Sequence, residues 1–257
     1  MRPLKLTSDY ERLGDKEMPA HTVKLLRREE VAEGTMSFYF DKPPGFQFKP
    51  GQYLDCSLID PPETDDEGNI RSFSIASAPA EENLMVATRM RDTAFKRVLK
   101  RMPLGSQLKI DGPLGSFTLH GNASRPAVFL AGGIGITPFR SMIVKATRER
   151  LANHIALFYL NRRPEDSAFL QELQQIGSEN QNCQIIGIMT KMKKSKRPWN
   201  GETGLIDKAM IARIVPNLAA PIYYIAGPPA MVTAMREILT AAGMNEDDIR
   251  SEDFAGY

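Results

Sequence analysis

The sequence predicts two domains in series, an antiparallel β-barrel followed by a doubly wound α/β domain built on a parallel sheet. Residues 22–119 hold short runs rich in β-branched and aromatic residues, separated by Pro, Gly, Asp and Asn. From residue 127 onward, apolar runs alternate with segments of helical periodicity. The polar segment 120–126 separates the two patterns, so we expect domains over 18–122 and 125–257.

Six strand-like runs and one helix make up the first predicted domain. Many short strands at this spacing are typical of a small antiparallel barrel. The runs are TVKLLRR (22–28), TMSFYF (35–40), GQYLDCSL (51–58), RSFSIAS (71–77), ENLMVATRM (82–90) and SQLKIDGPLGSFTL (106–119). The helix follows the capping residues Asp92 and Thr93, and its apolar positions recur at i, i+3, i+4 and i+7: Phe95, Val98, Leu99 and Met102.

Four apolar runs in the second domain are short enough to be buried parallel strands. They are AVFLA (127–131), IALFYL (155–160), CQIIGIM (183–189) and IYYIAG (222–227). The segments between them place apolar residues on one helical face. These faces are Phe139, Met142, Ile143 and Ala146 after Pro138; Phe169, Leu170, Leu173 and Ile176 after Ser167; and Met231, Met235, Ile238, Leu239 and Ala242 in the last helix.

Composition argues against several classes of protein. A net charge of +2 does not indicate a nucleic-acid binder, and no apolar stretch approaches the roughly 20 residues that span a membrane. The first residues lack the apolar core of a secretory signal, which predicts a cytoplasmic protein. Two cysteines cannot build a four-thiolate iron–sulfur cluster, and the isolated His21, His120 and His154 do not have the spacing of metal ligands.

The segment GGIGITP (132–138) joins the first buried run of the second domain to a helix. Ligands of doubly wound sheets bind at the carboxyl ends of the strands, and a helix amino terminus attracts anions. Gly132, Gly133 and Gly135 would let a pyrophosphate approach the backbone, Thr137 would add a hydroxyl, and Pro138 suits the first helical position. The segment therefore predicts a phosphate-binding turn, with a simple tight turn as the alternative.

The residues that follow the next run bear on the choice of dinucleotide. An acidic residue is expected there for the 2'-hydroxyl of the adenosine ribose. This chain has Arg162 and Arg163 instead. Two arginines favour a 2'-phosphate, and hence NADPH, through charge-assisted hydrogen bonds. A solvated surface pair is the alternative, and NADH stays open.

Four motifs in order, RSFS (71–74), GGIGITP (132–138), AGPPAM (226–231) and EDFAGY (252–257), resemble the ferredoxin-NADP reductase family. Members of that family join an antiparallel flavin-binding barrel to a pyridine-nucleotide-binding domain. The resemblance runs from about Thr22 to Tyr257 and implies FAD and NADP, or NAD, as cofactors.

The resemblance also implies site residues. Arg71 would pair with the FAD pyrophosphate, Phe73 would lie against the flavin ring where the family usually has tyrosine, and Ser74 would reach flavin N5. Glu252 would act near N5 as a charge partner or proton relay, which makes Ser74 and Glu252 the expected catalytic residues. Further expected cofactor contacts are Ser72, Thr88, Arg89, Met90, Phe95 and Lys96 for FAD and Gly227, Pro228 and Met231 for the nicotinamide.

The last motif implies a cover for the flavin. Either Phe254 or Tyr257 would lie over the ring face that the nicotinamide must occupy, and a loose tail is the alternative. Ala226 stands where many relatives have cysteine, which puts the rate in question rather than the reaction.

The predicted function is hydride transfer from NAD(P)H to FAD, with electrons passed to a separate carrier such as a ferredoxin, a flavodoxin or an oxygenase component. The loop KMKKSKR (191–197) has five positive residues and would steer an acidic carrier, bend toward the 2'-phosphate, or simply be solvated. Two other functions remain open, a reductase of free flavin or another small acceptor, and a flavoprotein subunit or sensor without turnover.

Overall fold

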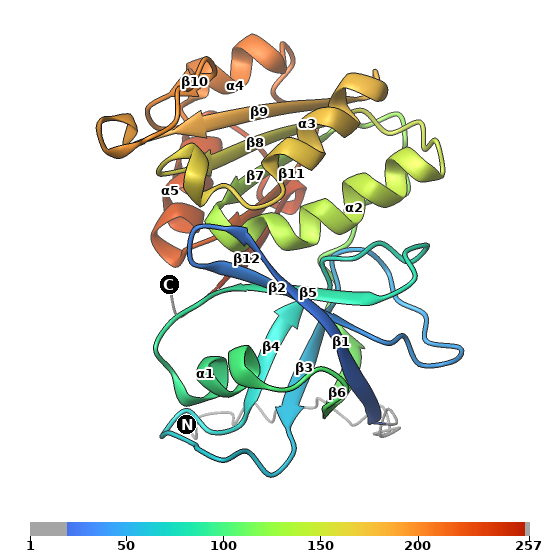
Figure 1. The fold of residues 1–257 in the computed structure, drawn as a ribbon. Helices are drawn as coiled ribbons and strands as arrows, with labels where there is room; N and C mark the ends of the chain where they lie inside the picture. The colour runs from blue at the N-terminus through green and yellow to red at the C-terminus, as the bar shows by residue number, and fades with distance from the viewer. Residues whose placement is uncertain (1–19, 255–257) are drawn as a thin grey trace, which may run out of the picture.

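The computed structural model describes residues 20–254, which form two sheets, one above the other in Figure 1. The first sheet is antiparallel, with strand order β4-β3-β6-β1-β2-β5. Its strands are β1 (His21–Ala32), β2 (Thr35–Phe40), β3 (Tyr53–Leu58), β4 (Ile70–Ser74), β5 (Leu84–Arg89) and β6 (Gln107–Leu114).

Alternation of side chains directs one face of this sheet into a shared core. Val23 and Leu25 of β1 and Leu108 and Ile110 of β6 are buried, while the residues between them are more exposed. An isolated antiparallel bridge from Ile75 to Val86 joins the ends of the sheet. The sheet thus curls into the predicted barrel.

Helix α1 (Ala94–Arg101) covers the barrel and confirms the predicted helix. The hydroxyl of Thr93 accepts a hydrogen bond from the backbone N–H of Lys96 at 3.4 Å, as an N-cap residue does. Phe95, Val98 and Leu99 pack into the barrel core.

The second sheet is parallel, with strand order β10-β9-β8-β7-β11-β12, which confirms the predicted doubly wound domain. The strands are β7 (Ala127–Gly132), β8 (Ile155–Asn161), β9 (Cys183–Met189), β10 (Glu202–Thr203), β11 (Ile222–Gly227) and β12 (Ile249–Asp253). Chain order reverses at β7, since β8 lies on one side of it and β11 on the other. This reversal is the point where such sheets bind ligands.

Helices cover both faces of the parallel sheet. One core joins β7 to α2 (Ile136–Arg148) and α3 (Leu170–Glu179), and a second core joins the opposite face to α4 (Lys208–Ile214) and α5 (Pro229–Ala241). None of the helices within residues 20–254 combines the length and apolarity needed to cross a bilayer.

One local expectation of the sequence needs correction. Phe169 does not lie on the helix that follows it but precedes α3 in a left-handed conformation, with φ of 60°. The alternative of a loose tail does not hold for Glu252, because β12 pairs with β11 over its whole length. Tyr257 lies outside the described residues.

Candidate functional site

The turns after β7 and β11 lie side by side at the carboxyl end of the parallel sheet. The two strands pair in register up to Ala131 and Ala226, so the GGIG and AGPP turns emerge together. The backbone N–H of Phe254 donates to the carbonyl of Gly227 at 3.0 Å, which holds the chain beyond β12 against the second turn. The structure therefore brings together three motifs that are far apart in sequence.

The glycines of the first turn serve two different purposes. A methyl group on Gly132 would lie 2.2 Å from the sulfur of Met231, and one on Gly135 would lie 2.2 Å from the carbonyl oxygen of Ala226. These two glycines let one turn pack against the other. Gly133 has φ of +54°, and a methyl group on it would meet no atom within 4 Å. Of the three glycines, Gly133 alone leaves open space beside its backbone.

Thr137 and Pro138 lie deeper in the helix than the sequence suggested. Helix α2 begins at Ile136, so Pro138 is its third residue, still in the first turn where an N–H has no partner within the helix. Thr137 is 3% exposed and its hydroxyl donates to the carbonyl of Ile134 at 3.0 Å. An anion here would therefore meet backbone N–H groups rather than a hydroxyl proton from Thr137.

The predicted flavin-binding residues gather between β4 and α1, and β4 runs toward the parallel sheet (Figure 1). The Arg71 guanidinium lies 5.4 Å from the ring centre of Phe95, and the rings of Phe73 and Phe95 are 5.9 Å apart. Phe73 is 8% exposed and belongs to the edge of the barrel core. Arg71, Phe73 and Phe95 thus share one face.

Carboxylates and cations surround the amino terminus of α1. The Asp65 carboxylate accepts from the backbone N–H of Ala94 at 2.6 Å, and Asp65 and Glu67 lie 3.7 and 2.7 Å from the Arg71 guanidinium. Burial, with the charges of Arg91 and Arg71, lowers the pKa of Lys96 to about 8. The donor set fits a diphosphate, and carboxylates from the loop 63–67 fill it in this structure.

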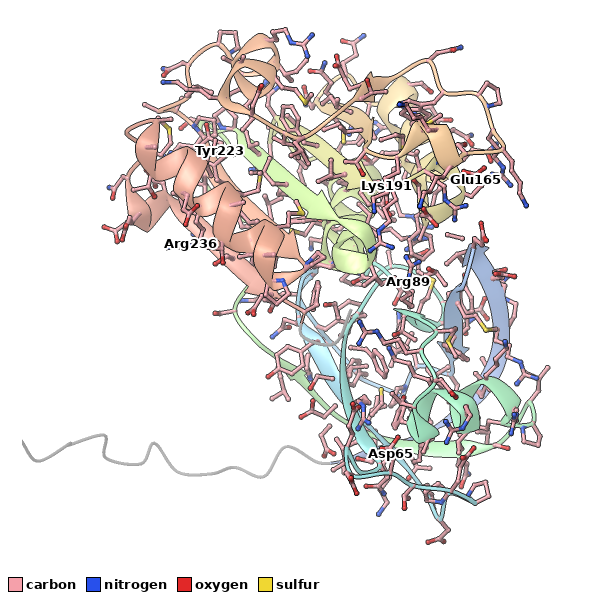
Figure 2. All side chains as sticks on the ribbon, turned by 90° about the vertical axis from the view of Figure 1, so that its left-hand side faces the viewer. Asp65, Arg89, Glu165, Lys191, Tyr223 and Arg236 are labelled. Carbon is pink, nitrogen blue, oxygen red and sulfur yellow. The ribbon has the colours of Figure 1, made fainter. Side chains whose placement is uncertain are left out.

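Sequence analysis missed Asp65 and Glu67, although the run ETDDE (63–67) marks the loop as strongly acidic. Figure 2 shows Asp65 at the end of the barrel that is far from the parallel sheet. The place of this loop over α1 follows from contacts between distant residues, which no local pattern encodes.

The other residues expected near FAD differ in their contacts. The Lys96 ammonium donates to the carbonyl of Arg89 at 2.8 Å, and Met90 packs against the barrel core. Thr88 is buried, and the hydroxyl of Ser72 donates to the carboxylate of Asp55.

Both expected catalytic residues carry a buried polar atom without a partner. Within the described residues only four buried side-chain polar atoms lack one: Ser37 Oγ, Ser74 Oγ, Asn161 Nδ2 and Glu252 Oε2. Leaving such an atom unpaired costs about 1–3 kcal/mol, so Ser74 at the end of β4 and Glu252 near the end of β12 have hydrogen-bonding capacity available for a ligand. Burial raises the pKa of Glu252 to about 7.

A chain of contacts links Ser74 to Glu252 across the two domains. Ser74 pairs with Tyr53 on the neighbouring strand. A methyl group on Gly115 would lie 3.0 Å from the Tyr53 ring and 3.9 Å from Glu252 Oε1. Gly115 and Glu252 also line a cavity of about 640 Å³.

The two arginines after β8 differ in their surroundings. Arg163 donates to both carboxylate oxygens of Asp166, at 2.7 and 3.0 Å, and to Glu33 of the barrel at 3.0 Å. Arg162 is exposed and forms no ion pair within residues 20–254. Its carbonyl accepts from the N–H of Lys191 at 2.8 Å, which places the basic loop next to it.

Lys191 is therefore the cation of the basic loop that is anchored next to Arg162. Figure 2 looks onto the side where the parallel strands end, and Lys191 and Glu165 lie on that side. The backbone N–H groups of Lys196 and Arg197 donate to Glu165 at 2.6 and 3.1 Å, so the loop folds back toward the sheet.

Comparisons with known families match both domains. Residues 22–119 match the model of an oxidoreductase FAD-binding domain, and residues 129–237 match the model of an oxidoreductase NAD-binding domain. Together these models cover most of the chain.

Curated relatives include subunits of oxygenase systems. The chain is 28% identical to the glycine betaine monooxygenase reductase subunit of Chromohalobacter salexigens, over 86% of this chain and 60% of that protein. It is 27% identical to the reductase component of propane 2-monooxygenase from Rhodococcus jostii, over 83% of this chain and 57% of that protein. The chain thus spans about 60% of the length of these relatives.

Solved structures show the same fold. The Amycolatopsis cytochrome P450 reductase GcoB superposes with a TM-score of 0.77 at 20% identity, over 96% of this chain and 73% of that one. A ferredoxin NADP⁺ reductase from Neisseria gonorrhoeae with bound FAD and NADP superposes with a TM-score of 0.75 at 20% identity, over 91% and 98% of the two chains. With two cofactor cradles on one fold and both domain models matched, the chain belongs to the ferredoxin-NADP reductase family.

Proposed function

We propose that this chain oxidises NADPH or NADH on its parallel-sheet domain, reduces FAD held by its barrel, and passes the electrons to a separate protein. The observation that carries the proposal is the pair of buried, unpaired polar atoms of Ser74 and Glu252, one from each domain, beside the turn that holds Gly133. When bound, the flavin accepts a hydride and releases electrons one at a time.

The barrel residues hold the FAD diphosphate through charge and geometry. Arg71, Lys96 and the first N–H groups of α1 would hold the diphosphate, and Asp65 and Glu67 contact the guanidinium and one of these N–H groups in this structure. Phe73 supplies an apolar surface for the ring system.

Ser74 and Glu252 act where the two ring systems meet. The Ser74 hydroxyl has hydrogen-bonding capacity left for flavin N5. Glu252 holds or releases a proton near neutral pH, because its pKa is about 7. Either form of the carboxyl group is thus available at working pH.

Arg162 and Lys191 are the residues we assign to a 2'-phosphate. Both are exposed at the carboxyl ends of β8 and β9, whereas Arg163 is already bound by two carboxylates. We therefore assign the preference for NADPH to Arg162 and the basic loop. Arg163 has a structural role instead, through its ion pairs with Asp166 and Glu33.

An oxygenase component or a ferredoxin fits best as the electron acceptor. The relatives named above are reductases of monooxygenases, and two buried cysteines give this chain no iron–sulfur cluster of its own. Reduction of a free flavin or another small acceptor is the second candidate. Retention of FAD through gel filtration would favour the first function over the second, because a flavin used as substrate must leave.

Anaerobic stopped-flow mixing with NADPH or NADH tests the proposal. We expect rapid loss of oxidised-flavin absorbance, and a chain that binds flavin without being reduced by either nucleotide would contradict it.

The nucleotide preference has a matched pair of variants. Arg162→Ala should raise KM for NADPH by about tenfold or more and leave KM for NADH nearly unchanged, because a charge-assisted hydrogen bond contributes about 1.5–3 kcal/mol. Arg163→Ala, which breaks the ion pairs with Asp166 and Glu33, should affect both nucleotides alike. Equal effects of Arg162→Ala on NADPH and NADH would remove the 2'-phosphate assignment.

A further inference from the structure

We propose that Arg140 is a positioning residue that fixes the nucleotide-binding helix against the flavin-binding strand, and so sets the separation of the two ring systems. This inference rests on the proposed function. Arg140 belongs to none of the four motifs' expected contacts, and its side chain reaches from α2 into the barrel domain.

All five guanidinium N–H groups of Arg140 are used. Nη1 donates to the carbonyl of Ala76 at 2.8 Å and to Glu81 at 2.9 Å. Nη2 donates to Glu81 at 3.1 Å and to Glu172 at 2.6 Å, and Nε donates to Glu172 at 2.8 Å. Ala76 and Glu81 belong to the barrel domain and Glu172 to α3, so one side chain ties three segments together.

Both ends of this connection lie close to the cofactor-binding residues. Ala76 comes two residues after Ser74, on the continuation of β4. Arg140 comes three residues after Thr137, in the helix whose first turn faces the nucleotide. A displacement at Arg140 would therefore move one cradle relative to the other.

A second hydrogen bond strengthens the same joint. The hydroxyl of Ser141 donates to the carbonyl of Ser77 at 2.6 Å, so two consecutive residues of α2 hold two consecutive carbonyls of one barrel segment. The barrel segment 76–81 is itself held in place, because the Glu81 carboxylate accepts from the backbone N–H of Ala78 at 2.6 Å.

The guanidinium is buried as well as fully bonded. Arg140 is only 6% exposed, and the Phe169 ring centre lies 5.2 Å from its guanidinium carbon. A planar fork with five donors in fixed directions suits this task, whereas a lysine ammonium has three donors and a flexible stem. A lysine here would keep the charge but lose the geometry.

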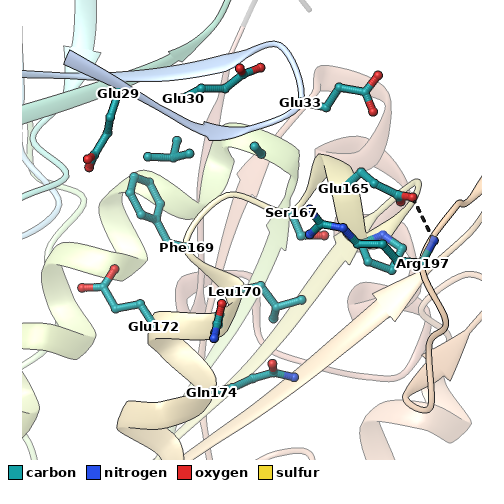
Figure 3. A pocket seen from close by; sticks show the side chains of 14 residues that line it. Glu29, Glu30, Glu33, Glu165, Ser167, Phe169, Leu170, Glu172, Gln174 and Arg197 are labelled. Carbon is teal, nitrogen blue, oxygen red and sulfur yellow. Dashed lines mark hydrogen bonds between the residues drawn. The ribbon is translucent and has the colours of Figure 1, made fainter.

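An open cleft lies beside the joint formed by Arg140 and Ser141, so individual contacts there hold the two domains together. A cleft of about 760 Å³ lies between the β1–β2 hairpin and the start of α3, lined on one side by Glu29, Glu30 and Glu33 and on the other by Phe169, Leu170 and Glu172 (Figure 3). Packed side chains do not fill the space there. Val31 and Ala32 pack against the parallel-sheet core beside this cleft, and Glu33 bonds to Glu165 and Arg163 at its exposed edge. The bonds of Arg140 and Ser141 are the buried polar contacts that set the register of the two domains here.

The test compares Arg140→Lys with the wild type, both loaded with FAD, by anaerobic stopped flow. We expect the limiting rate of flavin reduction to fall by about tenfold or more, because misplacement of about 1 Å can cost up to 100-fold. The Kd of the nucleotide should change by less than about threefold, and the long-wavelength charge-transfer absorbance of the stacked rings should weaken. Glu172→Gln, a milder change at the same joint, should shift the rate and the absorbance in the same direction.

Arg125→Lys is the matched control. Arg125 also combines an ion pair, to Asp248 at 2.7 Å, with bonds to two carbonyls, those of Ala220 and Pro221. All its partners lie in the parallel-sheet domain. This variant should lose thermal stability without a change in the limiting rate or in the charge-transfer absorbance.

Each result has a separate meaning. Unchanged rate and absorbance in Arg140→Lys, or equal losses in Arg125→Lys, would overturn the positioning role. A wild type that neither nucleotide can reduce would overturn the proposed function instead.

Discussion

At the scale of single residues, the unpaired polar atoms are the most informative feature of the site. Ser74 and Glu252 come from different domains, and both present buried oxygen atoms without a partner in the described chain. A folded protein rarely keeps such atoms, because each one destabilises it. Their occurrence at strand ends links the energetics of the fold directly to ligand binding.

Glu252 makes a prediction about pH. The pKa of Glu252 is about 7 in the folded protein, against an ordinary 4.5. Between these two pH values the native state holds a proton that the unfolded state has released. The resulting stabilisation is present below about pH 4.5 and is lost as pH rises toward and through 7. Wild-type protein should therefore lose on the order of 3 kcal/mol relative to Glu252→Gln between these limits.

Urea unfolding of both proteins at several pH values measures this difference. A constant difference in unfolding free energy across the range would show that Glu252 titrates normally.

A local motif is enough to single out a residue from sequence. Arg71 and Gly133 stand in short patterns that carry their expected chemistry, and their cofactor contacts stay predictions. The functions of Gly132 and Gly135 could not be predicted in this way, since the atoms that require them belong to Met231 and Ala226, nearly a hundred residues later. Arg163 is occupied by Asp166, three residues away, and by the distant Glu33, whereas Arg162 forms no ion pair within residues 20–254.

At the scale of elements, the acidic loop before β4 occupies the amino terminus of α1, where we propose that the FAD diphosphate binds. A carboxylate at that position satisfies a backbone N–H and complements the helix dipole, as a phosphate would. On the proposed function, we therefore expect the loop to compete with the diphosphate for these donors.

The double variant Asp65→Asn, Glu67→Gln tests this competition. We expect FAD to bind apoprotein about tenfold more tightly, because the diphosphate no longer displaces two charge-assisted contacts. Fluorescence titration of FAD at low ionic strength measures the Kd. Glu63→Gln is the control, since Glu63 pairs with Arg97 at 2.6 Å instead; weaker binding by the double variant would mean that the loop supports FAD.

Elements with strong periodicity were predicted well, and elements fixed by partners were not. The apolar run of β7 and the spacing in α1 both encode their own structure. Strand β12 reads IRSED, with one apolar residue, and it is a strand only because β11 offers an unpaired edge. Phe169 starts no helix because its ring packs against Arg140, a contact between segments.

At the scale of the whole molecule, two kinds of link join the domains. One is the buried joint around Arg140, and the other is the exposed contact of the β1–β2 hairpin with residues 163–165. In the second link the N–H of Glu33 donates to the carbonyl of Glu165 at 2.8 Å, and its carboxylate pairs with Arg163. The exposed hairpin contact stabilises the arrangement of the domains less than the buried joint does, because exposed ion pairs contribute about 0–1 kcal/mol.

Glu33→Gln follows as a prediction for the intact protein. The Glu33 side chain is 62% exposed, so its loss should change the limiting rate of flavin reduction by less than about twofold and leave thermal stability almost unaltered. Stopped flow and thermal melting under the conditions used for Arg140→Lys provide the comparison. A large loss of rate would assign the positioning role to the hairpin as well.

The contact between the two glycine-bearing turns constrains any redesign of this enzyme. Gly135 lies against the Ala226 carbonyl, and Gly132 lies against the Met231 sulfur. The conformation of each loop therefore depends on the other. Grafting a foreign nucleotide-specificity loop after β7 alone would leave it facing a mismatched neighbour. The two loops form a single exchangeable unit, and swaps between homologous enzymes should carry both.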